Sequence, residues 1–413
     1  MNIISEIFKN NSNIAFIIGN GINHRFFENQ VPSWNSLISD ISIVFADIKY
    51  PEAVQLKCPK CKAVIENKYY EAPGYSFTEL FDIIDLTHLE ECSRRNDSLL
   101  DLKKKTPSSL KEIQAAKTVN YDDILSVVNK NSIKAKSNST VAKQSLSRYK
   151  STYESFLKSC RDWCNQNLKD ANQLSDIDCI KRFMDIAINN GKLEINRNTI
   201  KRYVSMIFSP MYQSESMRIF LNNIKKKNIP ILTTNYDHLM SSALGLNKYR
   251  LPGKFTAFYP WNVYFSDKEL ANPSVGFGIW HINGMVDYIQ SIKIGLSDYM
   301  GNVERAREMI QGDYFSDFFV GKDQQKWSGY YSWMHILFNK DLFIFGLSLD
   351  ENEVFLRWLL LQRAKYAIIK NRTIKGWFFD TKISIGKKFF LEKLGIEAHE
   401  ISHDELYNAL SDI

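Results

Sequence analysis

Four short polar segments each follow an apolar run and contain side chains that could take part in chemistry. Glycines let a backbone approach a phosphate closely, and a histidine, with an unperturbed pKa of about 6.5, suits proton transfer at neutral pH. Asn and Asp side chains can hold the hydroxyl and amide groups of a ligand. The segments are Gly19-Asn20-Gly21-Ile22-Asn23, Thr233-Thr234-Asn235-Tyr236-Asp237, Trp280-His281-Ile282-Asn283-Gly284 and Phe345-Gly346-Leu347-Ser348-Leu349-Asp350.

Each segment also has a purely structural interpretation. The first lacks the third glycine of the usual dinucleotide-binding turn, so Gly19 and Gly21 could form only a tight connection. Asn235 and Asp237 could do no more than cap the following helix. A lone histidine such as His281 is more often a structural residue than a catalytic one. Taken singly, the segments leave both interpretations open.

The elements that must position these segments are strands of an α/β sheet. Short apolar runs that end in glycine or polar turns predict strands, and 351–369 predicts a helix between the last two of them. We expect one doubly wound, Rossmann-like parallel sheet with all four segments at its carboxyl edge, where such sheets bind ligands. There Gly346 and Ser348 could hold a second phosphate or a ribose. The predicted strands are Ile14–Ile18, Ile229–Thr233, Gly278–Ile282, Ile292–Leu296, Leu342–Phe345 and Thr373–Phe379.

The domain organisation follows from where this pattern stops and resumes. Residues 1–49 and 228–413 are expected to form a discontinuous α/β domain, interrupted by a mainly helical insertion over 50–227 without strands. Inside the insertion, Asn129–Ser151 is rich in Asn, Ser and Lys and poor in apolar residues, which predicts a loop between helices.

In order along the chain, the four polar segments resemble the motifs of the sirtuin superfamily. They are more similar to the bacterial sirtuin-like proteins of antiphage defence than to the protein deacylases. Val31-Pro32-Ser33-Trp34 and Ile294-Gly295-Leu296-Ser297-Asp298-Tyr299 also look like segments of those defence proteins. The resemblance covers Ile14 to Ile48 and Ile229 to about Phe379, outside the helical insertion, and implies a sheet of the sirtuin type.

The resemblance implies a role for each matching residue. Gly19 and Gly21 would cradle the pyrophosphate of NAD, while Asn235 would orient the nicotinamide ribose and Asp237 would contact the carboxamide. His281 would be the general base, so that His281 and Asn235 are the expected catalytic residues. The expected NAD-binding residues are Gly19, Gly21, Asn23, Asn235, Asp237, Gly346 and Ser348.

The expected reaction is hydrolysis of NAD to nicotinamide and ADP-ribose. Asn23 and Thr234 stand where deacylases usually have Ser and Gln, and no cysteine follows Cys179, whereas deacylases carry a four-cysteine zinc ribbon beyond the histidine. These departures disfavour the first alternative, an NAD-dependent protein deacylase. The second alternative is a sensor that binds NAD or ADP-ribose without cleaving it and acts through complex assembly. The presence of Asn235, Asp237 and His281 argues against a sensor, because binding alone would not require all three residues.

By the same resemblance, the protein would be the effector of an abortive-infection system that depletes cellular NAD. A permanently active enzyme would kill its host, so control by assembly or by a partner is expected. The candidate partners are further copies of the chain, a translocase-type ATPase and a nucleic-acid-guided protein.

The basic character of the chain is concentrated in one region. The formal net charge is +7, and Ser93–Ser151 contains 13 Lys or Arg against 5 Asp or Glu. Such a region could bind nucleic acid or another acidic partner, or it could be a solvated lysine-rich segment. The sequence contains no run of 18 apolar residues, so it predicts no membrane-spanning helix. Met1–Asn13 lacks the apolar core of a signal peptide. We therefore expect a cytoplasmic protein without a membrane partner.

The six cysteines suggest free thiols or a metal site rather than a disulfide framework. Cys58 and Cys61 have the spacing of zinc ligands, and His88 with Cys92 could complete a tetrahedral structural site near 58–92. The second pair is the weaker half, because any helix places residues four apart on one face. The remaining three, Cys160, Cys164 and Cys179, are expected to be core residues of helices.

Overall fold

The structure, a computed structural model, describes most of the α/β part of the chain and the second half of the predicted insertion. The described residues are 3–27, 30–33, 37, 41, 79, 81, 82, 86, 144–168, 171–189, 197–210, 212–310, 324–351 and 353–412.

Nine strands form a single sheet in the order β2-β4-β5-β6-β3-β1-β7-β8-β9. The six strands from β6 to β9 in this order run parallel to one another, whereas β5, β4 and β2 are attached antiparallel at one edge. The strands are β1 Ile14–Ile18, β2 Gln144–Ser145, β3 Ile231–Thr233, β4 Asn247–Arg250, β5 Val263–Ser266, β6 Ile279–His281, β7 Asp341–Phe345, β8 Gly376–Asp380 and β9 Ile396–Glu400.

The prediction of an α/β sheet is confirmed, but the prediction that all its strands are parallel is wrong. The parallel part has the strand order of a doubly wound sheet, with the chain moving outward from β1 to β3 and β6 and then returning to β7, β8 and β9. The order therefore reverses between β1 and β7. The antiparallel strands were missed because a hairpin of two short edge strands has no helix between its strands, so it escapes a search for strand–helix alternation.

Helices cover both faces of the sheet. In β1 all five residues are buried, but Phe16 and Ile18 pack into one apolar cluster and Ala15 and Ile17 into the other, as alternate residues of a strand must. The helices are α1 Ile3–Asn10, α2 Gly21–Phe27, α6 Leu146–Asn167, α7 Asp176–Asn189, α8 Arg197–Ile207, α9 Glu215–Lys226, α10 Leu239–Ala243, α11 Leu296–Ile310, α12 Trp333–Asn339, α13 Val354–Ile369, α14 Ile385–Lys393 and α15 His403–Ser411, with 3-10 turns η3 Ala171–Gln173, η4 Ile289–Ser291 and η6 Gln324–Lys326.

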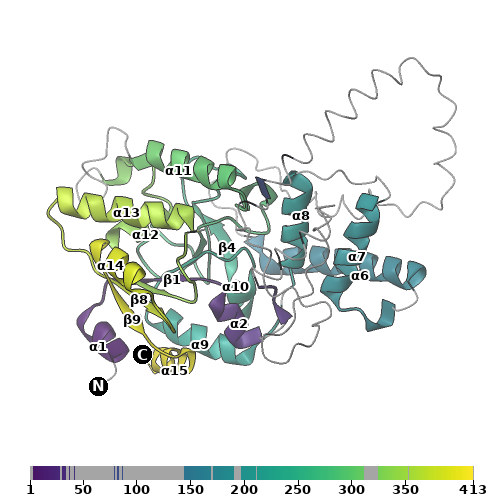
Figure 1. The fold of residues 1–413 in the computed structure, drawn as a ribbon, viewed down its shortest axis with the longest axis horizontal. Helices are drawn as coiled ribbons and strands as arrows, with labels where there is room; N and C mark the ends of the chain where they lie inside the picture. The colour runs from purple at the N-terminus through teal and green to yellow at the C-terminus, as the bar shows by residue number, and fades with distance from the viewer. Residues whose placement is uncertain are drawn as a thin grey trace, which may run out of the picture.

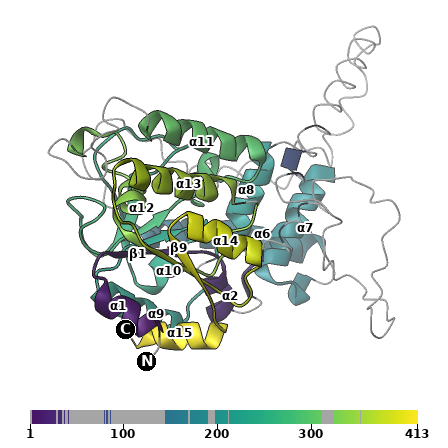
Figure 2. The same ribbon diagram turned by 60° about the vertical axis from the view of Figure 1, so that its left-hand side comes forward.

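The two helical layers are separated by the sheet (Figures 1 and 2). Helices α11, α12 and α13 lie on one face, and α1, α9 and α15 lie on the other. Helices α6 and α7 pack on each other beside the second layer, and buried residues of both belong to the same apolar cluster as Phe16 of β1. The later part of the predicted insertion thus shares a core with the sheet.

One predicted strand, Ile292–Leu296, is not a strand. The apolar residues Ile292 and Ile294 are fully buried, which produced the strand-like alternation in the sequence. The backbone N–H groups of Ile294 and Gly295 instead lie within hydrogen-bonding distance of the Asp298 carboxylate, at 3.3 and 3.5 Å. The Asp298 carboxylate thus satisfies these two backbone N–H groups just before α11, which begins at Leu296, so the segment needs no neighbouring strand.

The predicted loop Asn129–Ser151 is also partly wrong. From Gln144 onward the chain forms β2, which pairs with β4, and then α6, so the insertion contributes a strand to the sheet. Farther along α6 and α7, the three cysteines at 160, 164 and 179 are buried and free, which confirms their prediction as core residues. Burial raises the pKa of Cys164 to about 12, so this thiol stays protonated.

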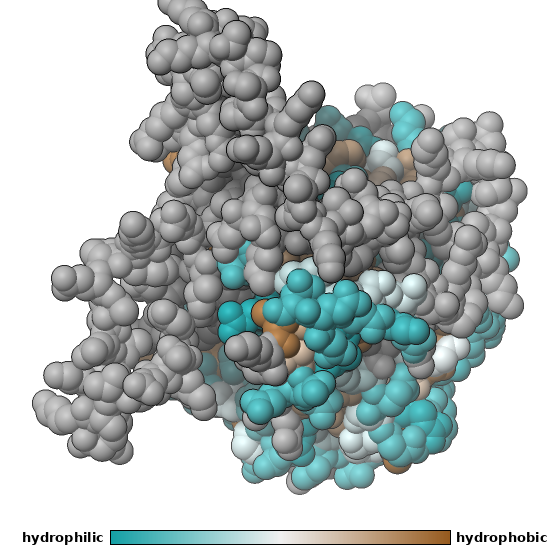
Figure 3. All heavy atoms as spheres, turned by 90° about the vertical axis from the view of Figure 1, so that its right-hand side faces the viewer, coloured by the Kyte–Doolittle hydropathy of each residue, from teal (hydrophilic) through white to brown (hydrophobic). Residues whose placement is uncertain are grey.

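Among the described residues, no helix is both long enough and apolar enough to cross a bilayer. The face on which α6 and α7 lie is mainly hydrophilic where its residues are described, with a small apolar patch (Figure 3).

The reversal point between β1 and β7 is closed by backbone rather than by side chains. The N–H of Gly21 donates to the carbonyl of Gly346 at 2.8 Å, and the N–H of Gly19 donates to Phe345 at 3.2 Å. A Cβ atom on Gly21 would lie 2.7 Å from the Cα of Gly346, and one on Gly19 would lie 2.5 Å from its carbonyl oxygen. Gly346 itself has φ +70°. The two turns can therefore touch only where these positions lack side chains.

This contact predicts that Gly21→Ala destabilises the fold by roughly 1–3 kcal/mol, because the new methyl group would overlap backbone that cannot swing aside. Gly386→Ala in α14 is the matched control, since a Cβ there meets nothing within 4 Å. Alanine at that helical position should stabilise by about 0.5–1 kcal/mol. Urea unfolding of both variants measures the difference, and equal midpoints would contradict the assigned contact.

Candidate functional site

The turn after β3 is tied to the end of β1 by the hydroxyl of Thr233. Its Oγ1 donates to the carbonyl of Ile18 at 2.9 Å and accepts the backbone N–H of Asn235 at 3.1 Å. The amide of Asn235 in turn donates to the carbonyl of Gly19 at 3.4 Å. The strand-end polar turns of β1 and β3 thus form one hydrogen-bonded unit, as expected for parallel neighbours.

Asp237 links the same two turns from the inside. Asn23 donates its amide to one carboxylate oxygen at 2.7 Å, and the N–H of Leu239, the first residue of α10, donates to the other at 2.9 Å. Burial raises the pKa of Asp237, and these hydrogen bonds partly offset that effect. The helix-capping role considered for Asp237 is therefore present, and both of its oxygens already have protein donors.

His281 ends β6 and is buried between the turn of β3 and the antiparallel edge. Its Nδ1 lies 2.7 Å from the carbonyl oxygen of Asn235, and because a carbonyl can only accept, Nδ1 carries the proton. Its Nε2 is buried and has no partner among the described residues. Burial, reinforced by the nearby charge of His238, lowers the pKa of His281 to about 3. The imidazole is therefore neutral at physiological pH and offers a lone pair on Nε2.

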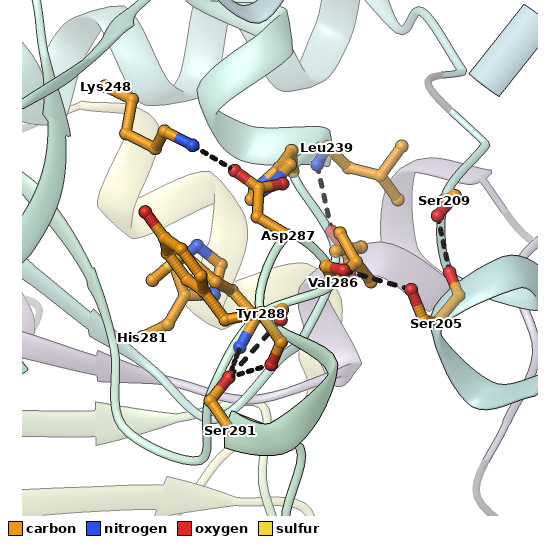
Figure 4. Close-up of polar contacts among 12 residues, drawn as sticks. Ser205, Ser209, Leu239, Lys248, His281, Val286, Asp287, Tyr288 and Ser291 are labelled. Atoms are coloured by element: carbon orange, nitrogen blue, oxygen red, sulfur yellow. Dashed lines mark hydrogen bonds and ion pairs between the residues drawn. The ribbon is translucent and has the colours of Figure 1, made fainter. Parts of the chain in front are cut away.

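A buried chain of charged groups supports His281 from behind. Lys248 of β4 donates to one oxygen of Asp287 at 2.6 Å (Figure 4). His238 Nε2 lies 2.5 Å from the other oxygen. The rings of His238 and His281 meet edge to face, with centroids 5.5 Å apart. Burial alone would raise the pKa of Asp287, but Lys248 and His238 outweigh it and hold that pKa well below its usual value.

Two further polar side chains at this edge were not singled out for a role in the sequence. Asn283 follows His281 by two residues, just beyond the end of β6. Its amide lies next to Glu353, just before α13. Burial raises the pKa of Glu353 to about 7, with the Asn283 amide acting in the opposite direction. Glu353 could have been suspected, because it closes the polar segment that begins at Gly346.

Several buried polar atoms without a standard hydrogen bond belong to connections that follow the parallel strands. Within the described part of the chain, His281 Nε2 and Asn23 Oδ1 are buried and lack a hydrogen-bond partner. The Asn283 amide and Glu353 Oε2 are also buried; they lie next to each other but make no hydrogen bond of standard geometry. All these atoms come from the connections after β1, β6 and β7. A buried polar atom without a partner costs about 1–3 kcal/mol, so these atoms are candidates to bind water or a polar ligand.

The remaining predicted residues lie at the rim. Gly346 forms the backbone contact described above. The N–H of Gly19 is already donated to the carbonyl of Phe345, and the N–H of Gly21 to the carbonyl of Gly346. These glycines thus supply close approach and no free N–H donors. Ser348 is exposed, and its carbonyl accepts Lys387, which also pairs with Asp350.

The proposed zinc ligands Cys58, Cys61, His88 and Cys92 lie outside the described residues. Among the residues that are described, no cluster of three or more His, Cys, Asp or Glu could hold a metal ion. The structural zinc site stays a prediction.

Comparison with known proteins found no match, neither among family models nor among curated proteins nor among solved structures.

The buried chain behind His281 predicts a large stability cost for Asp287→Asn. That variant leaves Lys248 buried without its counter-charge, which costs about 3–5 kcal/mol. Asp267→Asn is the control, because Asp267 pairs with Lys225 at the surface, where such pairs contribute about 0–1 kcal/mol. Denaturant unfolding at pH 7 measures both variants.

The pH dependence of this difference is fixed by the lowered pKa of Asp287. The stabilisation is fully present above the unfolded value of about 3.9 and is lost as pH falls further below it. The gap between wild type and Asp287→Asn should therefore shrink on acidification below about pH 4. A gap that persists unchanged to about pH 2 would contradict the charge assignment.

Proposed function

We propose that this protein is an NAD glycohydrolase that releases nicotinamide and leaves ADP-ribose. The observation that carries the proposal is His281, a buried neutral imidazole whose Nδ1 is held by the backbone of Asn235 and whose Nε2 lone pair has no partner among the described residues. It lies at the carboxyl edge of a doubly wound sheet, on the strand next to β3, and doubly wound sheets bind dinucleotides at this edge. The sirtuin-like sequence motifs support the same substrate.

The bond to be broken joins a cationic pyridinium to the anomeric carbon of ribose. Its electron pair leaves with nicotinamide, which departs neutral and needs no proton. Positive charge then develops on the ribose, as in glycoside hydrolysis. Water attacks the anomeric carbon and loses a proton as the new C–O bond forms. His281 Nε2 accepts that proton, or first polarises a ribose hydroxyl, because Nδ1–H is already donated to Asn235.

The unpartnered atoms at this edge fit a dinucleotide substrate. The Asn283 amide offers a donor and an acceptor, and Asn23 Oδ1 and Glu353 Oε2 offer acceptors for hydroxyl or carboxamide groups. The role of effector in antiviral defence, with activity controlled by assembly or a partner, rests on the resemblance to the defence proteins and belongs to the same proposal.

Nicotinamide release from NAD tests this site. The purified full-length protein is incubated with NAD, alone and with DNA or RNA as candidate activators. His281→Ala should lower the rate by about 10²–10⁴-fold, since it removes the proton acceptor. Asn235→Ala keeps the backbone carbonyl that holds His281 Nδ1 and should lower the rate because it removes the side-chain amide expected to orient the nicotinamide ribose. His403→Ala, an exposed histidine in α15, should leave the rate unchanged.

Circular dichroism must show that the variants are folded. Equal nicotinamide release by wild type, His281→Ala and Asn235→Ala would show that the site is wrongly placed. Binding of NAD without release under every condition would instead support the non-catalytic sensor.

The rate should also lack the usual histidine midpoint in its pH profile. His281 acts as a base in its deprotonated form, which is present above a pKa of about 3, so kcat/KM should not fall as pH is lowered through about 6.5. A midpoint near 7 that disappears in Glu353→Gln would report Glu353, whose pKa is about 7. A midpoint near 6.5 that survives in Glu353→Gln would contradict the buried neutral state of His281.

A further inference from the structure

A separate cleft lies beyond the antiparallel edge of the sheet. Its volume is about 670 Å³, within the range of small-molecule sites. Three parts of the chain form it: the 251–262 connection between β4 and β5, the second half of α11 and the residues from η6 to the start of α12. None of its lining residues belongs to the four polar segments at the strand ends.

The strand register places this cleft at the same edge of the sheet as His281. Arg250 pairs with Val263, and Phe265 pairs with Ile279 in β6, so the β4–β5 connection projects past the end at which β6 finishes. The cleft is therefore next to the candidate site but is built from different side chains.

Four aromatic side chains form the walls of the cleft. Trp261 is buried and stacks on Phe355 with centroids 5.9 Å apart. Trp327 is buried and donates its indole N–H to the carbonyl of Met309 at 2.6 Å. The remaining two, Tyr259 and Tyr331, are half-buried. Anchored aromatic walls bind a planar ring by stacking at little entropic cost.

The charged groups of the cleft are mainly cationic. Lys254, Arg305 and Lys326 line it, against one carboxylate, Glu308, which pairs with Arg305 at 2.8 Å. Behind the wall, the Lys293 ammonium lies 4.9 Å from the centroid of the Tyr259 ring and adds to the positive potential. The cleft therefore favours an anionic ligand.

One buried polar atom adds specificity. Asn262 lines the cleft and donates its Nδ2 to the carbonyl of Leu251 at 2.9 Å, which fixes the orientation of the amide. Its Oδ1 is buried and has no partner among the described residues. A fixed acceptor of this kind suits a ligand with an amino group on its ring.

We propose that this cleft binds a nucleoside monophosphate whose base carries an exocyclic amino group. The base stacks between the aromatic walls with its amino group on Asn262 Oδ1, and the phosphate lies against Lys254 and Arg305. Because the lining residues differ from those of the strand-end site, this second site does not depend on NAD cleavage.

Isothermal titration calorimetry with AMP, in the absence of NAD, tests the cleft. AMP should bind saturably, and adenosine should bind at least about 10-fold more weakly because it lacks the phosphate. IMP should also bind more weakly, because inosine presents a carbonyl where adenosine has its amino group. Lys254→Gln and Arg305→Gln should each weaken AMP binding about 10-fold. Arg307→Gln is the matched control, because Arg307 is exposed on the same helix as Arg305 and does not line the cleft.

Asn262→Ala should remove the preference for AMP over IMP while leaving the effect of the phosphate. Absence of saturable binding at millimolar AMP would overturn the proposal, as would equal binding of AMP and adenosine. Loss of AMP binding in Asn235→Ala, with normal binding in Arg305→Gln, would place the nucleotide in the strand-end site instead. A failure of NAD cleavage leaves all these titrations interpretable, because none of them measures turnover.

Discussion

The structure depends on one close approach of backbone to backbone, where the turn after β1 meets the turn after β7. This is the place where the strand order reverses, so two neighbouring parallel strands send their chains to opposite faces. Here Gly19, Gly21 and Gly346 have no Cβ atoms, and the turns join through N–H to carbonyl hydrogen bonds. This contact holds the carboxyl ends of β1 and β7 close together at the edge of the sheet where the candidate site lies.

The buried polar groups at this edge fall into two kinds, those with protein hydrogen-bond partners and those without. Asp237 has protein donors on both oxygens, and Asp287 is held between Lys248 and His238. These carboxylates stabilise the framework. His281 Nε2 and Asn23 Oδ1 have no such partners among the described residues. The contrast separates groups that hold the site together from groups available to a ligand.

The antiparallel edge contributes residues both to the candidate site and to the proposed cleft. Lys248 on β4 neutralises Asp287 behind the candidate site, and the connection that follows β4 forms the wall of the aromatic cleft. The candidate site and the proposed cleft are therefore built in part from the same hairpin. A ligand in the cleft that shifted this hairpin would also move the ion pair behind His281, which offers a physical route for control of the candidate site.

The sequence alone determined the parallel strands and the polar turns after them. These features are local: a buried parallel strand must be a short apolar run, and a turn at a crowded strand end must contain glycine or a small polar residue. The strand prediction for Ile292–Leu296 was wrong because a local pattern cannot distinguish a strand from a buried loop. Here the alternation reflects burial of a loop whose N–H groups lie against the Asp298 carboxylate.

Only the tertiary structure decided how distant residues combine. Lys248 and Asp287 are 39 residues apart and meet because β4 is added antiparallel beside β5, a pairing that no local pattern encodes. The neutral state of His281 likewise depends on burial and on the carbonyl of Asn235, which lies on a different strand end. The residue types are set by the chain, but their protonation states and partners are set by packing, because both depend on which groups exclude water from which others.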